Sequence, residues 1–143
     1  VPVRGLGSGD DDLARVLRHE YAHRVIADLG GRACPVWLNE GVAMWAEGAP
    51  EFRRAWALDQ VAGRTLLDLT ALRGSLSTLR RDQAQLAYAQ SYLAVDHLAE
   101  RYGDRSIAVL MHELQRTGDL ELASRSAFRA DLRDVLATFF GGM

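Results

Sequence analysis

The chain has 143 residues, enough to bury a hydrophobic core and typical of one domain. Its 17 basic and 19 acidic residues give a net charge of −2, so neither nucleic acid nor an anionic membrane surface is an expected partner. No stretch approaches the roughly 20 apolar residues of a membrane span, and no signal peptide is recognisable.

Residue usage also bears on the origin of the chain. All 17 basic residues are arginine, which indicates a GC-rich, bacterial genome. Cys34 is the single cysteine, so an intrachain disulfide is excluded and the compartment is left open. The chain begins with Val1 rather than Met, and residues 1–6 are typical of an edge strand cut from a longer protein. We therefore interpret residues 1–143 as one domain of a longer bacterial protein, exported, membrane-anchored or neither, whose oligomeric state is open.

The first expected helix covers about residues 13–29. Acidic residues at 10–12 suit a helix start, because carboxylates accept hydrogen bonds from exposed amides and favour the positive helix end. Apolar residues then recur at helical spacing, and the glycines at 30–31 favour a helix end.

This helix contains His19-Glu20-Tyr21-Ala22-His23, which has the HExxH spacing. Residues four apart lie on one helix face, so the imidazoles of His19 and His23 can bind one metal ion. Glu20 flanks that face and can act as general base toward a water. Two imidazoles, an open coordination position and a nearby carboxylate suit zinc-assisted hydrolysis. The pattern by itself also occurs by chance.

A second helix is expected from about Leu38 to Gly48, after an extended connector at Pro35. Glu40 is expected in its first turn, where a carboxylate is favoured, and completes a His-His-Glu zinc site. Glu47 follows seven residues later on the same face and is the candidate acceptor for a ligand histidine. A solvated glutamate at a helix end is the alternative for Glu47.

The rest of the chain also shows helical patterns. Glycine and proline positions favour helices over about 50–62, 68–72, 82–101, 104–118, 120–128 and 131–140, with Asp104 as a cap and a loop at 74–79. Strand signals are nearly absent. We predict a mainly α fold, an orthogonal helical bundle with at most one short N-terminal strand.

The HExxH motif followed by Trp37-Leu38-Asn39-Glu40-Gly41 resembles the gluzincin zinc metallopeptidases, especially the alanyl-aminopeptidase type and bacterial peptidase MA-like domains. The resemblance implies a zincin-like catalytic domain, with Zn²⁺ bound by His19, His23 and Glu40 and with Glu20 as general base. Sixteen residues separate His23 from Glu40, slightly fewer than in the aminopeptidases, which suits a shortened relative. Thermolysin-type enzymes have an aspartate four residues after the glutamate ligand, where this chain has Met44. The contact that this aspartate makes around the zinc ligands is therefore not expected here.

A third segment, residues 88–103, is similar to an aminopeptidase helix that opens with a tyrosine. By that resemblance, Tyr88 donates a hydrogen bond to the tetrahedral intermediate, and Tyr92, one turn further, is the alternative oxyanion donor. Either tyrosine is otherwise a half-buried core residue. His97 and His112 are expected to be structural or exposed, because His97 is half a turn out of phase with Tyr88 and His112 has no ligand partner at metal spacing.

We predict a zinc metallopeptidase that hydrolyses peptide bonds of a peptide or protein substrate through a metal-activated water. The alternative is a zinc-binding domain without peptidase activity, used for structure or recognition, since gluzincins hold substrate against a strand upstream of HExxH and 18 residues precede His19 here. A helical interaction module with an accidental HExxH is a third hypothesis. The glycine-rich amine-binding motif of the aminopeptidases is absent, so endo- versus exopeptidase specificity is not predicted.

Overall fold

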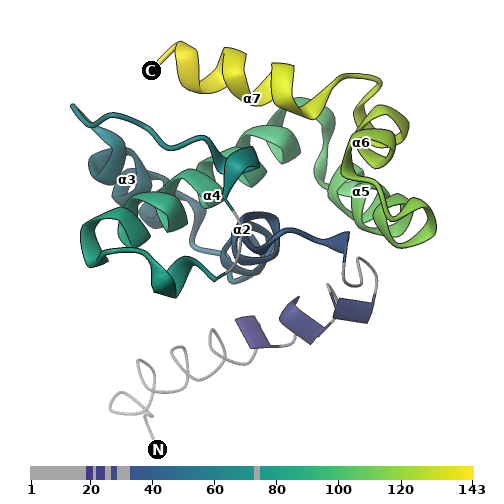
Figure 1. Ribbon diagram of the computed structural model, residues 1–143, viewed down its shortest axis with the longest axis horizontal. Coiled ribbons are helices and arrows are strands. Elements are labelled where there is room, and N and C mark those ends of the chain that lie inside the picture. Colours follow the sequence, from purple (N-terminus) through teal and green to yellow (C-terminus); the bar gives the residue numbers. More distant parts are fainter. Residues whose placement is uncertain (1–18, 21, 25–26, 29–32, 73–74) are drawn as a thin grey trace, which may run out of the picture.

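The computed structural model describes residues 19–20, 22–24, 27–28, 33–72 and 75–143, and in this part of the chain the regular structure is helical (Figure 1). The α-helices are α2 (Val36–Ala46), α3 (Pro50–Val61), α4 (Arg81–Tyr102), α5 (Asp104–Thr117), α6 (Leu120–Phe128) and α7 (Leu132–Gly141), with short 3₁₀ helices η2 (Leu69–Ala71) and η3 (Leu76–Thr78). The prediction of a mainly α bundle is confirmed. The proposed N-terminal strand lies outside the described residues.

Helix α4 is central to the bundle and packs against α2, α3 and α5 (Figure 1). Its buried face includes polar side chains whose hydrogen bonds are satisfied, as burial requires. The Gln90 amide accepts from the Leu67 N–H at 2.8 Å and donates to the Leu67 carbonyl at 2.9 Å. The Ser91 hydroxyl donates to the Ala87 carbonyl at 2.6 Å. The two Gln90 bonds attach the segment around Leu67 to α4.

Helix α2 begins two residues earlier than expected. Pro35 is its N-cap, with φ −66° and ψ 152°, so Val36 is already helical. The prediction that Glu40 lies in the first turn is therefore wrong, because Glu40 is the fifth helical residue. Its position at the site follows from the face it occupies and not from the positive helix end.

Two smaller expectations also need correction. Gly103, with φ 90°, occupies the N-cap position of α5, so Asp104 is the first helical residue and not the cap. The expected loop at 74–79 contains η3, because the Ser75 hydroxyl accepts a hydrogen bond from the Ser77 N–H and nucleates a turn.

Residues without an assigned role in the site have ordinary structural surroundings. Cys34 is a free, half-buried thiol, and burial raises its pKa to about 12, as for an unreactive packing residue. The His97 ring stacks on Phe139 with 4.1 Å between centroids, while His112 is exposed. None of the described helices is long and apolar enough to span a membrane.

Glu121 on α6 gives a testable electrostatic prediction. Its Oε2 atom is buried without a hydrogen-bond partner in the described structure, and burial together with the nearby Asp131 carboxylate raises the pKa of Glu121. A carboxyl group with a higher pKa in the folded than in the unfolded state stabilises the fold most when it is protonated. The free energy of unfolding therefore falls as pH rises from about 4.5 through the folded pKa. Glu121→Gln should raise Tm at pH 7 by about 2 °C and flatten this pH dependence. Thermal unfolding at pH 4, 5.5 and 7 measures both effects, and an unchanged Tm at pH 7 contradicts the account.

Candidate metal centre

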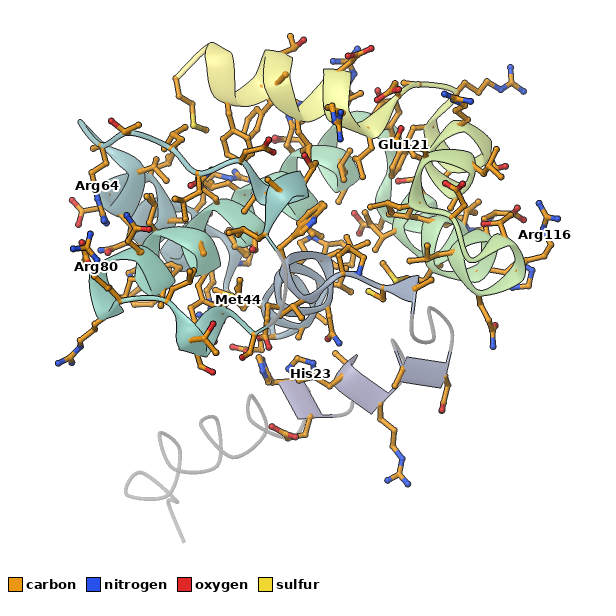
Figure 2. All side chains as sticks on the ribbon, viewed as in Figure 1. His23, Met44, Arg64, Arg80, Arg116 and Glu121 are labelled. Atoms are coloured by element: carbon orange, nitrogen blue, oxygen red, sulfur yellow. The ribbon has the colours of Figure 1, made fainter. Side chains whose placement is uncertain are left out.

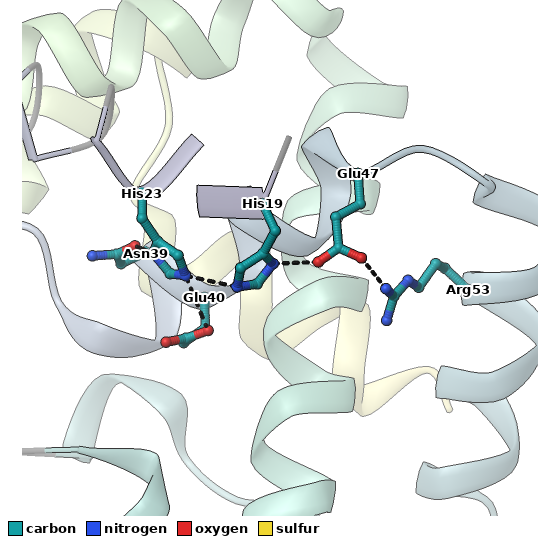
Figure 3. Close-up of polar contacts among 6 residues, drawn as sticks. All are labelled: His19, His23, Asn39, Glu40, Glu47 and Arg53. Carbon is teal, nitrogen blue, oxygen red and sulfur yellow. Dashed lines mark hydrogen bonds and ion pairs between the residues drawn. The ribbon is translucent and has the colours of Figure 1, made fainter. Parts of the chain in front are cut away.

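Three candidate ligands, predicted from the sequence, come together in the structure. His19 and His23 lie on the N-terminal helical segment, and Glu40 lies on α2 (Figure 3). One ligand atom from each residue lies within 4.8 Å of the others. The two Nε2 atoms are 2.8 Å apart, and His23 Nε2 is 3.7 Å from Glu40 Oε2. Figure 2 shows the His23 side chain extending from its segment toward α2.

The Nδ1 atoms of both histidines face oxygen acceptors. His23 Nδ1 lies 2.5 Å from Asn39 Oδ1, and His19 Nδ1 contacts Glu47 Oε1 (Figure 3). A carboxylate or amide oxygen carries no hydrogen, so each Nδ1 must be the donor. In a neutral imidazole the Nε2 atom then bears a lone pair. Both lone pairs therefore face the point that Glu40 also approaches.

This arrangement fits a tetrahedral metal ion. Two lone pairs 2.8 Å apart repel unless a cation or a proton lies between them. Zinc bonds of 2.0–2.1 Å place tetrahedral ligand atoms roughly 3.3 Å apart. The distance between the two Nε2 atoms, 2.8 Å, is shorter than this value, and the distance from His23 Nε2 to Glu40 Oε2, 3.7 Å, is longer. About a quarter of each ligand side chain is exposed, so solvent reaches the site.

Glu47 is buried, with 8% of its surface exposed, although it lies at the end of α2. Its Oε1 accepts from His19, and its Oε2 accepts from the Arg53 guanidinium on α3. The structure therefore brings Glu47 against the histidine pair and leaves it little contact with solvent.

Two residues of the site were missed by reasoning from sequence. Asn39 directly precedes Glu40 in α2, and consecutive side chains of a helix point in different directions. Asn39 therefore contacts Nδ1 of His23, whereas Glu40 approaches Nε2 of the same ring. Its position beside a predicted ligand was the available signal. Arg53 reaches Glu47 across the turn between α2 and α3, and no helical spacing rule connects residues on either side of a turn.

The two candidate tyrosines of α4 have different surroundings. Tyr88 is half-buried, and its pKa is raised by burial and by the negative charge of Glu40, so its phenol stays protonated at neutral pH. Tyr92 is 1% exposed, and its hydroxyl donates to the Pro50 carbonyl at 3.4 Å. The structure therefore places Tyr88 within the electrostatic influence of the site and directs the Tyr92 hydroxyl to the start of α3.

Glu20 is exposed on the same helical segment as the two histidines. It directly follows His19, and an exposed carboxylate is free to meet a solvent molecule or a substrate. Its side chain does not share the convergence point of the three ligand atoms.

Comparison with protein families gives one finding. The family model of the peptidase MA superfamily matches residues 6–139, which include all of the candidate site. Searches of curated proteins and of solved structures found no match to the chain.

Proposed function

This chain belongs to the peptidase MA superfamily, and from that membership we propose that it is a zinc-dependent metallopeptidase acting on peptides or proteins. The observation that carries the proposal is the pair of imidazole lone pairs facing Glu40, with each Nδ1 held by an oxygen acceptor. A chance pair of histidines has no need of two such acceptors, whereas metal-ligating histidines almost always have them.

In the proposed mechanism His19, His23 and Glu40 hold the metal. Zinc in such a site supplies Lewis-acid chemistry, which lowers the pKa of a water toward about 7 and polarises the scissile carbonyl. The Glu20 carboxylate accepts the proton of the attacking water and later delivers it to the leaving amine.

The other residues orient groups or stabilise charge. The Tyr88 phenol, kept protonated by its raised pKa, donates a hydrogen bond to the substrate oxygen that becomes negative in the transition state. Asn39 and Glu47 fix the ring orientation and tautomer of the histidines. Tyr92 has no part in this mechanism, because its hydroxyl already donates to Pro50.

The test combines metal content with proteolysis. Purified protein supplied with zinc should retain the metal in equimolar amount by elemental analysis and should cleave unfolded casein. Treatment with 1,10-phenanthroline should abolish cleavage, and added zinc should restore it. Equimolar zinc without cleavage would support the alternative of a non-peptidase zinc-binding domain. Failure to bind added zinc contradicts both functions.

A further inference from the structure

Glu47 connects the candidate metal centre to α3. Each of its carboxylate oxygens has its own partner: Oε1 accepts from His19 Nδ1, and Oε2 accepts from Arg53 Nη2 (Figure 3). The side chains of Glu47 and Arg53 are 7% and 19% exposed, so this ion pair is shielded from water.

We propose that Arg53 is a positioning residue of the metal centre, which acts on His19 through the Glu47 carboxylate. The inference rests on the proposed function, since it assumes that His19 binds metal through Nε2. A buried carboxylate with one unpaired oxygen is costly, so Arg53 stabilises the rotamer in which Glu47 meets His19. His19 is then held with Nδ1 protonated and Nε2 available as a ligand.

The local backbone explains how a residue of α3 reaches the end of α2. Gly48 and Ala49 both have left-handed backbone angles, with φ 85° and 55°. Two such residues in succession reverse the chain, which brings the first turn of α3 back toward Glu47. The strained conformation of Ala49, which lacks the freedom of glycine, is consistent with a turn that the surrounding contacts maintain.

Helix α3 packs along α4 through contacts that do not involve Arg53. Arg54 donates two hydrogen bonds to the Asp96 carboxylate, at 2.8 and 3.1 Å, and the Tyr92 hydroxyl donates to the Pro50 carbonyl. Adjacent arginines thus have separate tasks: Arg54 docks α3 on α4, whereas Arg53 reaches the metal centre.

This division provides a matched control. Arg53→Leu and Arg54→Leu each remove a guanidinium from the same helix and take an arginine partner away from a carboxylate. Only Arg53 has a carboxylate partner that contacts a candidate ligand. A general loss of stability therefore affects both variants, whereas a loss of metal affinity should be confined to Arg53.

The first measurement is zinc affinity by competition with a chromophoric chelator. Arg53→Leu should weaken zinc binding about tenfold, at the lower end of the 10–100-fold effect typical of groups that orient metal-ligating histidines. Arg53→Lys, which keeps the charge, should lose less zinc affinity than Arg53→Leu. It is the variant to use if Arg53→Leu does not fold. Arg54→Leu should bind zinc as the wild type does, even if its Tm falls.

A double variant tests whether Arg53 acts through Glu47. Glu47→Ala should weaken zinc binding about 10–100-fold, and adding Arg53→Leu to it should cause no further loss. Additive losses would mean that Arg53 acts by another route and would overturn the inference, as would wild-type affinity in Arg53→Leu.

A second readout needs no metal. Long-range ¹H–¹⁵N NMR of the metal-free protein, at a pH where the ring is neutral, reports which nitrogen of His19 carries the hydrogen. The wild type and Arg54→Leu should show the Nδ1–H tautomer, and Arg53→Leu should show a mixture. If the wild type fails to bind zinc, the proposed function fails, and the tautomer comparison still decides the role of Arg53: an unchanged tautomer overturns it, and a mixture supports it.

Discussion

Glu20→Gln is expected to lower the rate of peptide hydrolysis by about 10²–10⁴-fold, the usual contribution of a general acid–base group, while zinc stays bound. Glutamine has nearly the same shape as glutamate but cannot accept the proton of the attacking water. Zinc should be retained because His19, His23 and Glu40 supply the converging ligand atoms and Glu20 does not.

The measurement pairs kcat/KM on a quenched fluorescent peptide with zinc affinity for each protein. Glu100→Gln is a matched control, because this glutamate is 68% exposed on α4 and lies three turns beyond Tyr88. It should behave as the wild type. Wild-type hydrolysis by Glu20→Gln would refute the assigned base, and loss of zinc along with hydrolysis would identify Glu20 as a ligand.

The pairing of His19 with His23 was predictable because it depends on local geometry, whereas Glu40 was assigned to the site from its own motif and the resemblance to the gluzincins. Residues four apart on a helix lie side by side whatever the rest of the fold, which places His19 beside His23. The spacing between Glu40 and Glu47 brings both to one face of α2 by the same argument. The start of α2 was less predictable, because a proline allows a helix to begin directly after it or some residues later.

Contacts that depend on the tertiary arrangement were not predictable from spacing. Asn39 and Arg53 reach the histidine pair and Glu47 only because the N-terminal segment and α3 pack against α2 as they do. Tyr88 and Tyr92 share a helix face, so sequence reasoning kept both as candidate oxyanion donors. The distinction between them comes from α3, whose first carbonyl accepts from the Tyr92 hydroxyl.

Gly41→Ala is expected to lower the free energy of unfolding by about 2–3 kcal/mol, through overpacking between α2 and α4. A Cβ atom at Gly41 would lie 2.4 Å from the Ser91 carbonyl oxygen and 2.8 Å from Val95 Cγ2. The oxygen belongs to the backbone of α4 and cannot rotate away, so the two helices must separate. Gly41 directly follows Glu40, and Ser91 lies one turn beyond Tyr88, so the same separation should also move these two side chains apart.

Thermal unfolding should show a fall in Tm of about 8 °C for Gly41→Ala. Gly141→Ala is the matched control, because this glycine lies in α7 and a Cβ atom added there would meet open space. Alanine normally stabilises a helix relative to glycine by about 0.5–1 kcal/mol, so Gly141→Ala should be neutral or more stable than the wild type. A stabilised Gly41→Ala would mean that α2 and α4 lie farther apart than their contact at Gly41 indicates. The Glu40 charge would then act more weakly on the Tyr88 phenol, and the proposed placement of Tyr88 beside the metal centre would lose its support.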